Sequence, residues 1–266
     1  MQAEFNLKRE QNNRLICEIG KHPRCNLHFH SQIEIYLVVS GEVEVWVNNC
    51  RRVLSAGEMS VALSYDAHGY HEVREAEIEY LIVPTDLCGE FLKVLQNKQI
   101  ENPFISDRAL FDEIKTCFLK IRESGNEISV RGYIYVILGM LLDRIRFEAR
   151  REPKDHEVSS EILRYISAHC REDLSASSIS LAFGYNPSYL SRAFKSKFKI
   201  GLVQYLTMMR LREAVLLMKD PGKSITECAY ESGFRSLRTF YRCFQNEFGC
   251  APQEYRIKNT SARRGG

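Results

Sequence analysis

The stretch FGYNPSYLSRAFKSKF, residues 183–198, decides the fold, because it recurs as SGFRSLRTFYRCFQNEF at residues 232–248. Gly184 and Gly233 lie 49 positions apart, and the residues around each predict the same local structure. A short helix rich in small residues leads into each glycine, and a longer amphipathic helix with basic residues on its outer side follows. Two copies of one helix-turn-helix unit are therefore predicted.

Local signals place the helix ends of the first unit. Ser175 is a favourable N-cap for the short helix, and Gly184 tolerates the backbone angles of the turn. Asn186 and Pro187 supply an N-cap and a first-turn proline for the longer helix. Its inner face should hold Leu190, Ala193, Phe194 and Phe198, and its outer face Ser188, Ser191, Arg192 and Lys195.

The second unit repeats these signals. Ser224 begins a short helix, and Ser236 caps a longer one whose phenylalanines 240, 244 and 248 recur at a spacing of four. Residues near the start of such a helix reach base edges: arginine can bind guanine O6 and N7, and apolar groups can contact the thymine methyl. The outer face of the longer helix carries Leu237, Arg238, Tyr241, Arg242 and Gln245.

A single helix is predicted between the two units, over residues 202–218 (LVQYLTMMRLREAVLLM). At about 1.5 Å per residue it would be roughly 25 Å long. A connector of this kind can place two readers about 34 Å apart, one turn of DNA, so that both enter successive major grooves on one face.

The charge distribution singles out the same half of the chain. From Val158 onward there are 17 Lys and Arg against 9 Asp and Glu, a net charge of +8. The preceding residues carry 20 against 25, a net charge of −5. A basic half is expected to bind a polyanion, so the predicted macromolecular partner is double-stranded DNA.

The C-terminal part of the chain resembles the AraC/XylS family of bacterial regulators over about 100 residues. The most specific motifs of this resemblance lie in the second helix-turn-helix unit. That family has an Ile-x-x-Ile-Ala helix, a Gly-Phe turn, a Phe-x-x-x-Phe helix and a closing Gly-x-x-Pro-x-x-Tyr-Arg. Cys228 departs from the aliphatic residue of this pattern, and Ser180 from an alanine common in the first unit; both positions should be packed. The matching residues are Ile225, Cys228, Ala229, Gly233, Phe234, Phe240, Phe244, Gly249, Pro252, Tyr255 and Arg256.

The resemblance implies a sequence-specific DNA-binding transcription regulator, expected to be an activator, with RNA polymerase as a further partner. It also implies an N-terminal domain that senses a small molecule and dimerises. The implied base readers are Ser188, Ser191, Arg192, Leu237, Arg238, Tyr241 and Arg242. The predicted phosphate contacts are Asn186, Lys195, Lys197, Ser236 and Gln245.

The N-terminal part predicts a small β-barrel or sandwich. Its strand-like runs IEIYLVV, EVEVWV and IEYLIV, within residues 33–83, are rich in β-branched and aromatic residues. Turns are expected at Ser40-Gly41, Asn48-Asn49 and Ala56-Gly57. Several short strands with tight turns are typical of such folds.

A histidine motif sharpens this prediction. His28-x-His30-x-x-x-Glu34, followed after six residues by Gly41, resembles the first cupin motif. The second cupin motif is degraded, with Ser55-Ala56-Gly57 where the pattern has Pro-x-Gly, although a later histidine keeps its spacing. Period-two geometry places the first three side chains on one strand face, beside His68 or His71.

We interpret His28, His30, Glu34, Trp46 and His68 as lining an effector pocket, with no metal and no cofactor bound. The effector is unidentified; relatives with such sensor domains frequently bind sugars. Two other interpretations remain for the histidines: ligands of a divalent metal, or structural residues with satisfied hydrogen bonds. Trp46 could stack on a sugar or pack in the core.

The sequence therefore predicts a two-domain α+β protein. A cupin-like barrel occupies residues 1–105, and two helices follow over 106–150. The second of these has an apolar face, Tyr133, Ile134, Ile137, Leu138, Leu141, Leu142 and Ile145, that packs on the barrel or forms a homodimer interface. A charged segment around residues 147–161 is predicted to be a linker between the domains, and we place the linker at residues 151–160. The double helix-turn-helix domain spans 161–258, and a tail spans 259–266.

The remaining features favour a cytoplasmic protein. No apolar run is long enough to span a membrane, and the first residues lack a secretory signal. The nine cysteines form no zinc-like pairs or disulfide framework and should be reduced. The alternative is a metal-dependent cupin enzyme with a helical appendage, but it leaves the repeat and the basic half unexplained.

Overall fold

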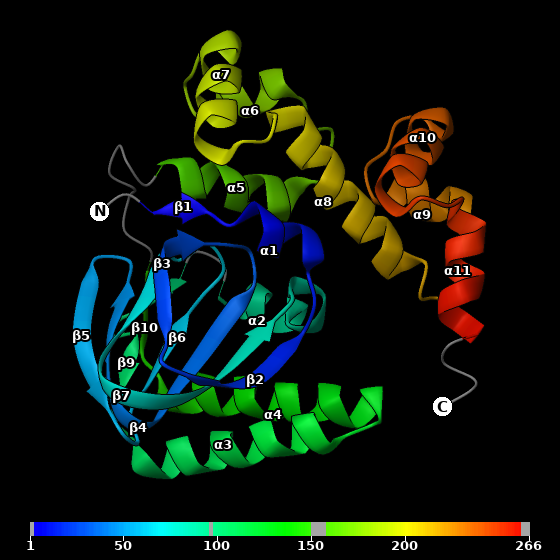
Figure 1. Cartoon of the computed structure of the whole chain (residues 1–266). Helices are drawn as coiled ribbons and strands as arrows, with labels where there is room; N and C mark the ends of the chain where they lie inside the picture. Colours follow the sequence, from blue (N-terminus) through cyan, green and yellow to red (C-terminus); the bar gives the residue numbers. More distant parts are fainter. Residues whose placement is uncertain (1–2, 96–97, 150–157, 262–266) are drawn as a thin grey trace. The chain divides into compact units, whose positions relative to one another are not determined.

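The computed structural model describes residues 3–95, 98–149 and 158–261 (Figure 1). The chain divides into two compact units, Met1–Asp155 and His156–Gly266. The first unit is mainly a β-sheet with helices, and the second is entirely helical in its described residues. The predicted α+β class and its order of domains are confirmed.

The first unit is built on an eight-stranded sheet in which two long strands, β4 (Ile33–Val47) and β7 (His68–Val83), pair antiparallel along their lengths. The two halves of β4 also pair with β6 (Met59–Ala62) and β5 (Cys50–Ser55). The two ends of β7 also pair with β3 (Arg24–Phe29) and β2 (Ile16–Lys21). The edges are completed by β1 (Glu4–Phe5) and β9 (Phe104–Ile105).

Bulges bend this sheet into the barrel that the cupin resemblance implies. The predicted turn at Ser40-Gly41 is wrong, because both residues lie within the continuous strand β4, where the register to β7 shifts. Gly41 has φ +74°, and a Cβ there would lie 2.0 Å from the carbonyl oxygen of Glu75. The close approach of the two strands therefore requires glycine. The turns predicted at residues 48–49 and 56–57 are confirmed.

Each face of the bent sheet has its own core. One face packs against α2 (Gly89–Val94), α3 (Arg108–Glu123) and α4 (Glu127–Arg144) around a large apolar cluster (Figure 1). The other face encloses a smaller cluster around Tyr36, Val45 and Tyr70. The remaining elements are α1 (Leu7–Asn12), the 3-10 helix η1 (Thr85–Leu87), β8 (Lys98–Ile100) and β10 (Phe147–Ala149).

The apolar face predicted for the second helix packs within the first unit. Ile134, Ile137, Leu138 and Leu141 of α4 are all buried in the large cluster. This outcome matches one of the two interpretations of that face, packing on the barrel. A dimer interface on α4 would have to use its opposite side.

The charged segment around residues 147–161 is only partly described, and its first residues form a strand of the first unit. β10 pairs antiparallel with β8, so residues 147–149 belong to the first unit despite their charged neighbours, because backbone pairing does not depend on apolar side chains. Residues 150–157 of the segment lie outside the described residues, and α5 already begins at Val158. At the other end, the first three residues of the predicted tail, 259–261, are helical.

The second unit consists of seven described helices, and the predicted caps are confirmed. Ser175 and Ser224 each form a capping box with the residue three positions later, and Asn186 and Ser236 accept hydrogen bonds from the first turns of the longer helices. The helices are α5 (Val158–His169), α6 (Ala176–Ala182), α7 (Pro187–Phe198), α8 (Leu202–Leu217), α9 (Ile225–Glu231), α10 (Leu237–Phe248) and α11 (Pro252–Ser261).

Two chain-wide predictions can be compared with the structure. Among the described residues, no helix combines the length and the apolar character needed to cross a bilayer. All nine cysteines are free thiols, and burial raises the pKa of Cys170 to about 12. A thiol with so high a pKa carries little thiolate at neutral pH.

Candidate nucleic-acid interface and histidine cluster

The first candidate interface is the outer face of α7. Ser188, Arg192 and Lys195 are exposed there, whereas Ser191 and Lys197 are half-buried. Asn186 lies at the N-terminus of α7, where its side-chain oxygen accepts hydrogen bonds from the backbone N–H groups of residues 188 and 189. All six of these predicted DNA contacts therefore lie along one helix and its cap.

The second candidate interface is the outer face of α10. Arg238, Tyr241, Arg242 and Gln245 are exposed, and Ser236 caps the helix. Leu237 differs from them, because it is half-buried and packs against the core formed by Phe240, Phe244 and their neighbours. Leu237 is therefore the half-buried one among the predicted base readers on α10.

The helix ends give the true alignment of the two units. Both α7 and α10 contain 12 residues, and both end at a left-handed residue, Lys199 or Gly249. The long helices are therefore offset by 50 positions, although the glycines of the turns are offset by 49, because Arg235 is one extra residue in the second turn. On this alignment, Ser188, Ser191 and Arg192 correspond to Arg238, Tyr241 and Arg242.

The charges on both faces are available to an anionic ligand. Within the described part of the chain, Arg192, Arg238 and Arg242 make no ion pair with a carboxylate, and the first turns of α7 and α10 contain no acidic residue. The dipole of a helix N-terminus also favours a phosphate there. The geometry and the charge thus both suit a nucleic-acid backbone.

One exposed side chain on α7 was not predicted. Tyr189 has 56% of its surface exposed and lies next to Ser188 at the start of the helix. The assignment of an inner and an outer face left it out, because it follows a polar position and precedes the buried Leu190. Its exposure, rather than any sequence signal, marks it as a candidate contact.

The two departures from the family pattern occupy packed positions, as expected. Cys228 and Ser180 are both fully buried. The Ser180 hydroxyl donates a hydrogen bond to the carbonyl oxygen of Ala176, 2.7 Å away, so its burial leaves no unsatisfied polar group.

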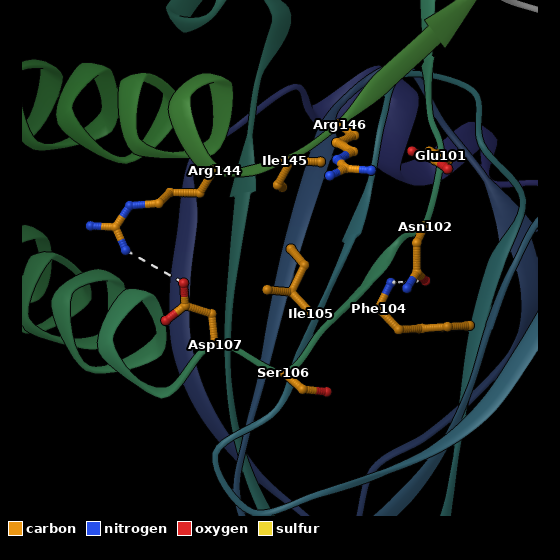
Figure 2. Close-up of a pocket in the computed structure, with 9 residues that line it drawn as sticks. All are labelled: Glu101, Asn102, Phe104, Ile105, Ser106, Asp107, Arg144, Ile145 and Arg146. Carbon is orange, nitrogen blue, oxygen red and sulfur yellow. Dashed lines mark hydrogen bonds and ion pairs between the residues drawn. The ribbon is translucent and has the colours of Figure 1, made fainter.

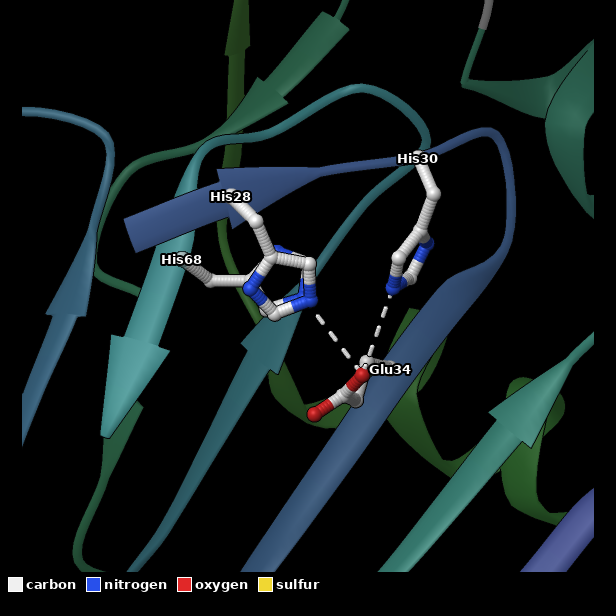
Figure 3. A group of neighbouring side chains, drawn as sticks. All are labelled: His28, His30, Glu34 and His68. Atoms are coloured by element: carbon white, nitrogen blue, oxygen red, sulfur yellow. Dashed lines mark ion pairs between the residues drawn. The ribbon is translucent and has the colours of Figure 1, made fainter. Parts of the chain in front are cut away.

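Four predicted residues of the first unit form a compact cluster. His28 lies near the end of β3, His30 follows that strand, Glu34 lies on β4 and His68 begins β7 (Figure 3). One ligand atom from each residue lies within 4.8 Å of those of the other three. His30, Glu34 and His68 are buried, and His28 is half-buried, so His28 provides the open side. The alternative histidine, His71, is exposed and lies apart.

Backbone carbonyls set the tautomers of two of these histidines. The Nδ1–H of His28 donates to the carbonyl oxygen of Asn26 at 2.9 Å, and that of His68 to Asp66 at 2.8 Å. A carbonyl oxygen only accepts hydrogen bonds, so each neutral ring carries its lone pair on Nε2. The Nε2 atoms of His30 and His68 both lie 3.4 Å from the same oxygen of Glu34.

The charges of the cluster follow from burial and mutual contact. Burial raises the pKa of the Glu34 carboxyl, but the neighbouring His68 and His30 outweigh it and hold that pKa well below its usual range. Burial lowers the pKa of His28 to about 4 and also lowers the pKa of His30. Burial acts in the same direction on His68, but the carboxylate of Glu34 raises the pKa of that ring overall. Glu34 is therefore an anion held between imidazoles.

This donor set fits a divalent metal. Three imidazole nitrogens and one carboxylate oxygen are common ligands of transition metals, and the carbonyls that fix the tautomers are typical outer-shell partners. The ring nitrogens of His30 are buried and have no hydrogen-bond partner within the described residues. His28, His30, Glu34 and His68 could therefore hold such an ion.

Trp46 does not lie with the other predicted pocket residues. The neighbouring Val45 and Val47 point into the small core, so Trp46 is on the opposite face of β4, where the guanidinium carbon of Arg51 lies 5.1 Å from the ring centroid. Alternation counted from Glu34 predicts the inner face, but the bulges in β4 reverse it. Trp46 is therefore not placed to stack on an effector bound beside the four clustered residues.

A separate hollow of about 390 Å³ lies at the edge of the first unit (Figure 2). Among its lining residues, Arg144 lies 3.4 Å from Asp107, and it lies equally far from Glu113 outside the lining. It shares no residue with the histidine cluster. The lining residues are Glu101, Asn102, Phe104, Ile105, Ser106, Asp107, Arg144, Ile145 and Arg146.

Comparison with known protein families agrees with both units. A helix-turn-helix domain model matches residues 179–258, and a cupin domain model matches residues 15–84. The melibiose operon regulatory protein of Escherichia coli K12 is 22% identical over 260 residues, which cover 86% of this chain and 82% of that protein. An uncharacterized HTH-type transcriptional regulator of Staphylococcus aureus is 27% identical over 136 residues, covering 49% of this chain and 18% of that protein.

Solved structures show weaker similarity. Apo ToxT from Vibrio cholerae matches with a TM-score of 0.42 and 12% identity, covering 91% of this chain and 97% of ToxT. The DNA-binding domain of AdpA in complex with a target DNA matches with a TM-score of 0.38 and 23% identity, covering 41% of this chain and 97% of that domain. The chain therefore carries an AraC-type helix-turn-helix domain in its second unit and a cupin domain in its first, and it resembles a transcription regulator over most of its length.

Proposed function

We propose that this regulator binds two adjacent half-elements of an operator by inserting α7 and α10 into successive major grooves. The observation that carries this proposal is that equivalent positions of the two helices present exposed side chains, with their arginines free of carboxylates among the described residues. The base readers are Ser188, Ser191, Arg192, Arg238, Tyr241 and Arg242, with a minor contribution from Leu237. The phosphate contacts are Asn186, Lys195, Lys197, Ser236 and Gln245.

A spacing experiment tests the two-element operator. An operator is first selected from random duplexes with the full-length protein, and base pairs are then inserted between its two half-elements. Five inserted pairs turn one half-element to the opposite face of the duplex, about half a helical turn. We expect them to abolish two-element binding. Unchanged affinity for the duplex with the insertion contradicts the proposal.

For the first unit, we propose that the histidine cluster is the polar end of an effector site that is entered past His28. The half-buried ring of His28 is the exposed part of an otherwise buried set, and the anionic Glu34 can accept hydrogen bonds from hydroxyl groups. The effector class we propose is a sugar, in analogy with the melibiose operon regulatory protein.

Calorimetric titration with a panel of monosaccharides and disaccharides tests the effector site. A sugar that binds wild type should bind His28→Gln at least about tenfold more weakly, the loss of one good hydrogen bond to a charged or buried partner. Trp46→Phe is the matched control, since Trp46 lies on the other face of β4 and should leave affinity unchanged. Equal affinity for wild type and His28→Gln would place the effector elsewhere.

A divalent metal is a second candidate ligand for the same cluster. The Nε2 lone pair of neutral His68 faces one oxygen of Glu34, and two acceptors that face each other need a shared proton or cation; Nε2 of His30 lies at the same distance from that oxygen. Elemental analysis of the purified protein separates the two candidates. One metal ion per chain, lost in Glu34→Gln, supports the second candidate, whereas a protein without metal supports a directly bound effector.

We also propose that the regulator is a homodimer held by the outer side of α4. Ile128 there is 79% exposed, and Tyr135 and Val136 lie on the same side. Gly132 and Gly139 have no atom within 4 Å of an added Cβ, although each glycine costs a helix about 1 kcal/mol. A second copy of α4 crossing closely at these glycines explains both features.

Sedimentation of the full-length protein tests the dimer. Replacing Gly139 with Leu should weaken dimerisation because the side chain would separate the two helices, while Leu119→Ala on α3 serves as the control. If Gly139→Leu sediments as wild type does, α4 is not the interface.

The remaining proposals concern the regulatory output. We propose that the protein acts in the cytoplasm as an activator that contacts RNA polymerase, and that it has no enzymatic activity, as its relatives are regulators. Transcription in vitro from a promoter carrying the selected operator tests activation. Fewer transcripts upon addition of the protein would identify a repressor instead.

A further inference from the structure

We propose that Arg210 sets the register between the two DNA-reading helices. It does so by holding the loop 170–174 between α8 and the turn of the second helix-turn-helix unit. This inference rests on the proposed two-element binding and adds a positioning residue to it. Arg210 itself lies within α8 and is not among the proposed DNA contacts.

The guanidinium of Arg210 donates hydrogen bonds to three backbone carbonyls of this loop, at alternate residues. Its Nε–H donates to the carbonyl oxygen of Cys170 at 2.8 Å, and one terminal nitrogen donates to those of Glu172 at 3.0 Å and Leu174 at 3.2 Å. The last carbonyls of a helix lack partners within it, and α5 ends at His169. Arg210 therefore satisfies the end of α5 and fixes the path of the loop to α6.

The same loop also touches the second helix-turn-helix unit. Gly233 has φ +93°, and a Cβ there would lie 2.4 Å from the Cys170 oxygen, 2.9 Å from Nε of Arg210 and 3.0 Å from Cα of Arg171. Arg235, the extra residue of this turn, forms an ion pair with Asp173 at 2.6 Å. The second turn thus packs directly on the loop that Arg210 holds.

The turn of the first helix-turn-helix unit has no such neighbour among the described residues. A Cβ added at Gly184 meets no atom within 4 Å, although this glycine has the equivalent place and also a positive φ. The difference shows that the contact at Gly233 is not a requirement of a helix-turn-helix unit. It is a contact between the two helix-turn-helix units, and it positions α9 and α10 relative to α5 and α6.

This geometry requires arginine at position 210. A planar guanidinium offers five donors in a fixed arrangement, whereas the ammonium group of lysine is a compact charge on a flexible stem. Lysine would keep the charge and most of the packed side chain but could not hold all three carbonyls in one plane. Arg210→Lys should therefore leave each helix-turn-helix unit folded and loosen the register between these two units.

The test compares three duplexes: the selected two-element operator, the same operator with one base pair inserted between its half-elements, and a duplex with a single half-element. Wild type should prefer the uninterrupted operator. Full-length Arg210→Lys should bind the single half-element like wild type but lose about tenfold or more on the two-element operator, because part of the gain from two linked sites is lost. It should also discriminate less against the inserted base pair.

Further variants keep the outcome decisive. Asp173→Asn removes the ion pair with Arg235 at an exposed carboxylate, where a folding defect is not expected, and should relax the spacing preference in the same direction. Gln204→Ala, at an exposed position of α8, is the matched control. If Arg210→Lys does not fold, Asp173→Asn alone decides.

The inference is overturned if the folded variants keep both the affinity and the spacing preference of wild type. Failure of the proposed function looks different, because wild type itself would then show no preference for two half-elements. A uniform loss of affinity on all three duplexes by Arg210→Lys would assign Arg210 to general DNA binding and would also overturn the register role.

Discussion

Replacing Arg192 with Ala tests whether α7 reads bases. The arginine is exposed and makes no carboxylate contact in the described part of the chain; its Nε–H donates only to the Ser188 carbonyl, 3.2 Å away. Removal should therefore change the free energy of unfolding by less than about 0.5 kcal/mol. A bidentate contact with guanine is worth about 1–3 kcal/mol, so affinity for the operator should fall about 5- to 150-fold.

The equivalent change on α10, Arg242→Ala, should have an effect of similar size. Because the two arginines would contact different half-elements, the effects should add, to about 2–6 kcal/mol in the double variant. Affinity is measured by fluorescence anisotropy on the selected operator and on a scrambled duplex, at two or more salt concentrations.

Lys195→Ala is the comparison, because Lys195 is a proposed phosphate contact on the same helix. It should weaken binding to both duplexes about equally and reduce the salt slope by about 1. Arg192→Ala should instead spare the scrambled duplex. An equal loss on operator and scrambled DNA with Arg192→Ala would refute base reading by this residue.

Three further predictions concern the stability of the second unit and are measured by chemical denaturation followed by circular dichroism. Gly184→Ala should lower the free energy of unfolding by about 1–2 kcal/mol, because residue 184 has a left-handed backbone. Gly233→Ala should lower it by at least about 3 kcal/mol, because the new Cβ also meets the Cys170 oxygen. Equal losses for the two variants would contradict the close packing of the second turn. Phe244→Ala should cost about 3–5 kcal/mol, since the ring is fully buried in the core of the second unit; a smaller loss would indicate that the core can collapse into the cavity. Ser224→Ala should cost about 1 kcal/mol through loss of the capping box that starts α9, and an unchanged midpoint would show that the cap is dispensable.

The helical unit could be predicted in detail because its signals are local. The serine and asparagine caps, the glycine turns and the phenylalanines at a spacing of four all act within about one or two helical turns. The residues exposed on α7 and α10 followed from the same periodicity. Tyr189 and Leu237 are exceptions: Tyr189 is exposed without having been predicted, and Leu237, at the first position of its helix, turns towards a core that periodicity does not locate.

The sheet could be predicted less well because pairing depends on distant residues. The Ser40-Gly41 turn and the inward position of Trp46 both failed for one reason: β4 continues through a bulge and reverses its alternation there. His28, His30, Glu34 and His68 do converge, and the bulge of β4 lies beyond Glu34 and therefore does not reverse the side on which that residue lies.

The amino-acid sequence by itself determined that this chain has two helix-turn-helix readers, a basic half and a cupin-like barrel with a histidine motif, because caps, periodicity and charge are properties of neighbouring residues. Only the tertiary structure decided which side of α4 is free and that one arginine joins the loop after α5 to the turn before α10. Both features arise from packing between distant segments; the contacts of Arg210 and Gly233 with the loop span 36 to 63 residues of chain, and no local pattern encodes such proximity.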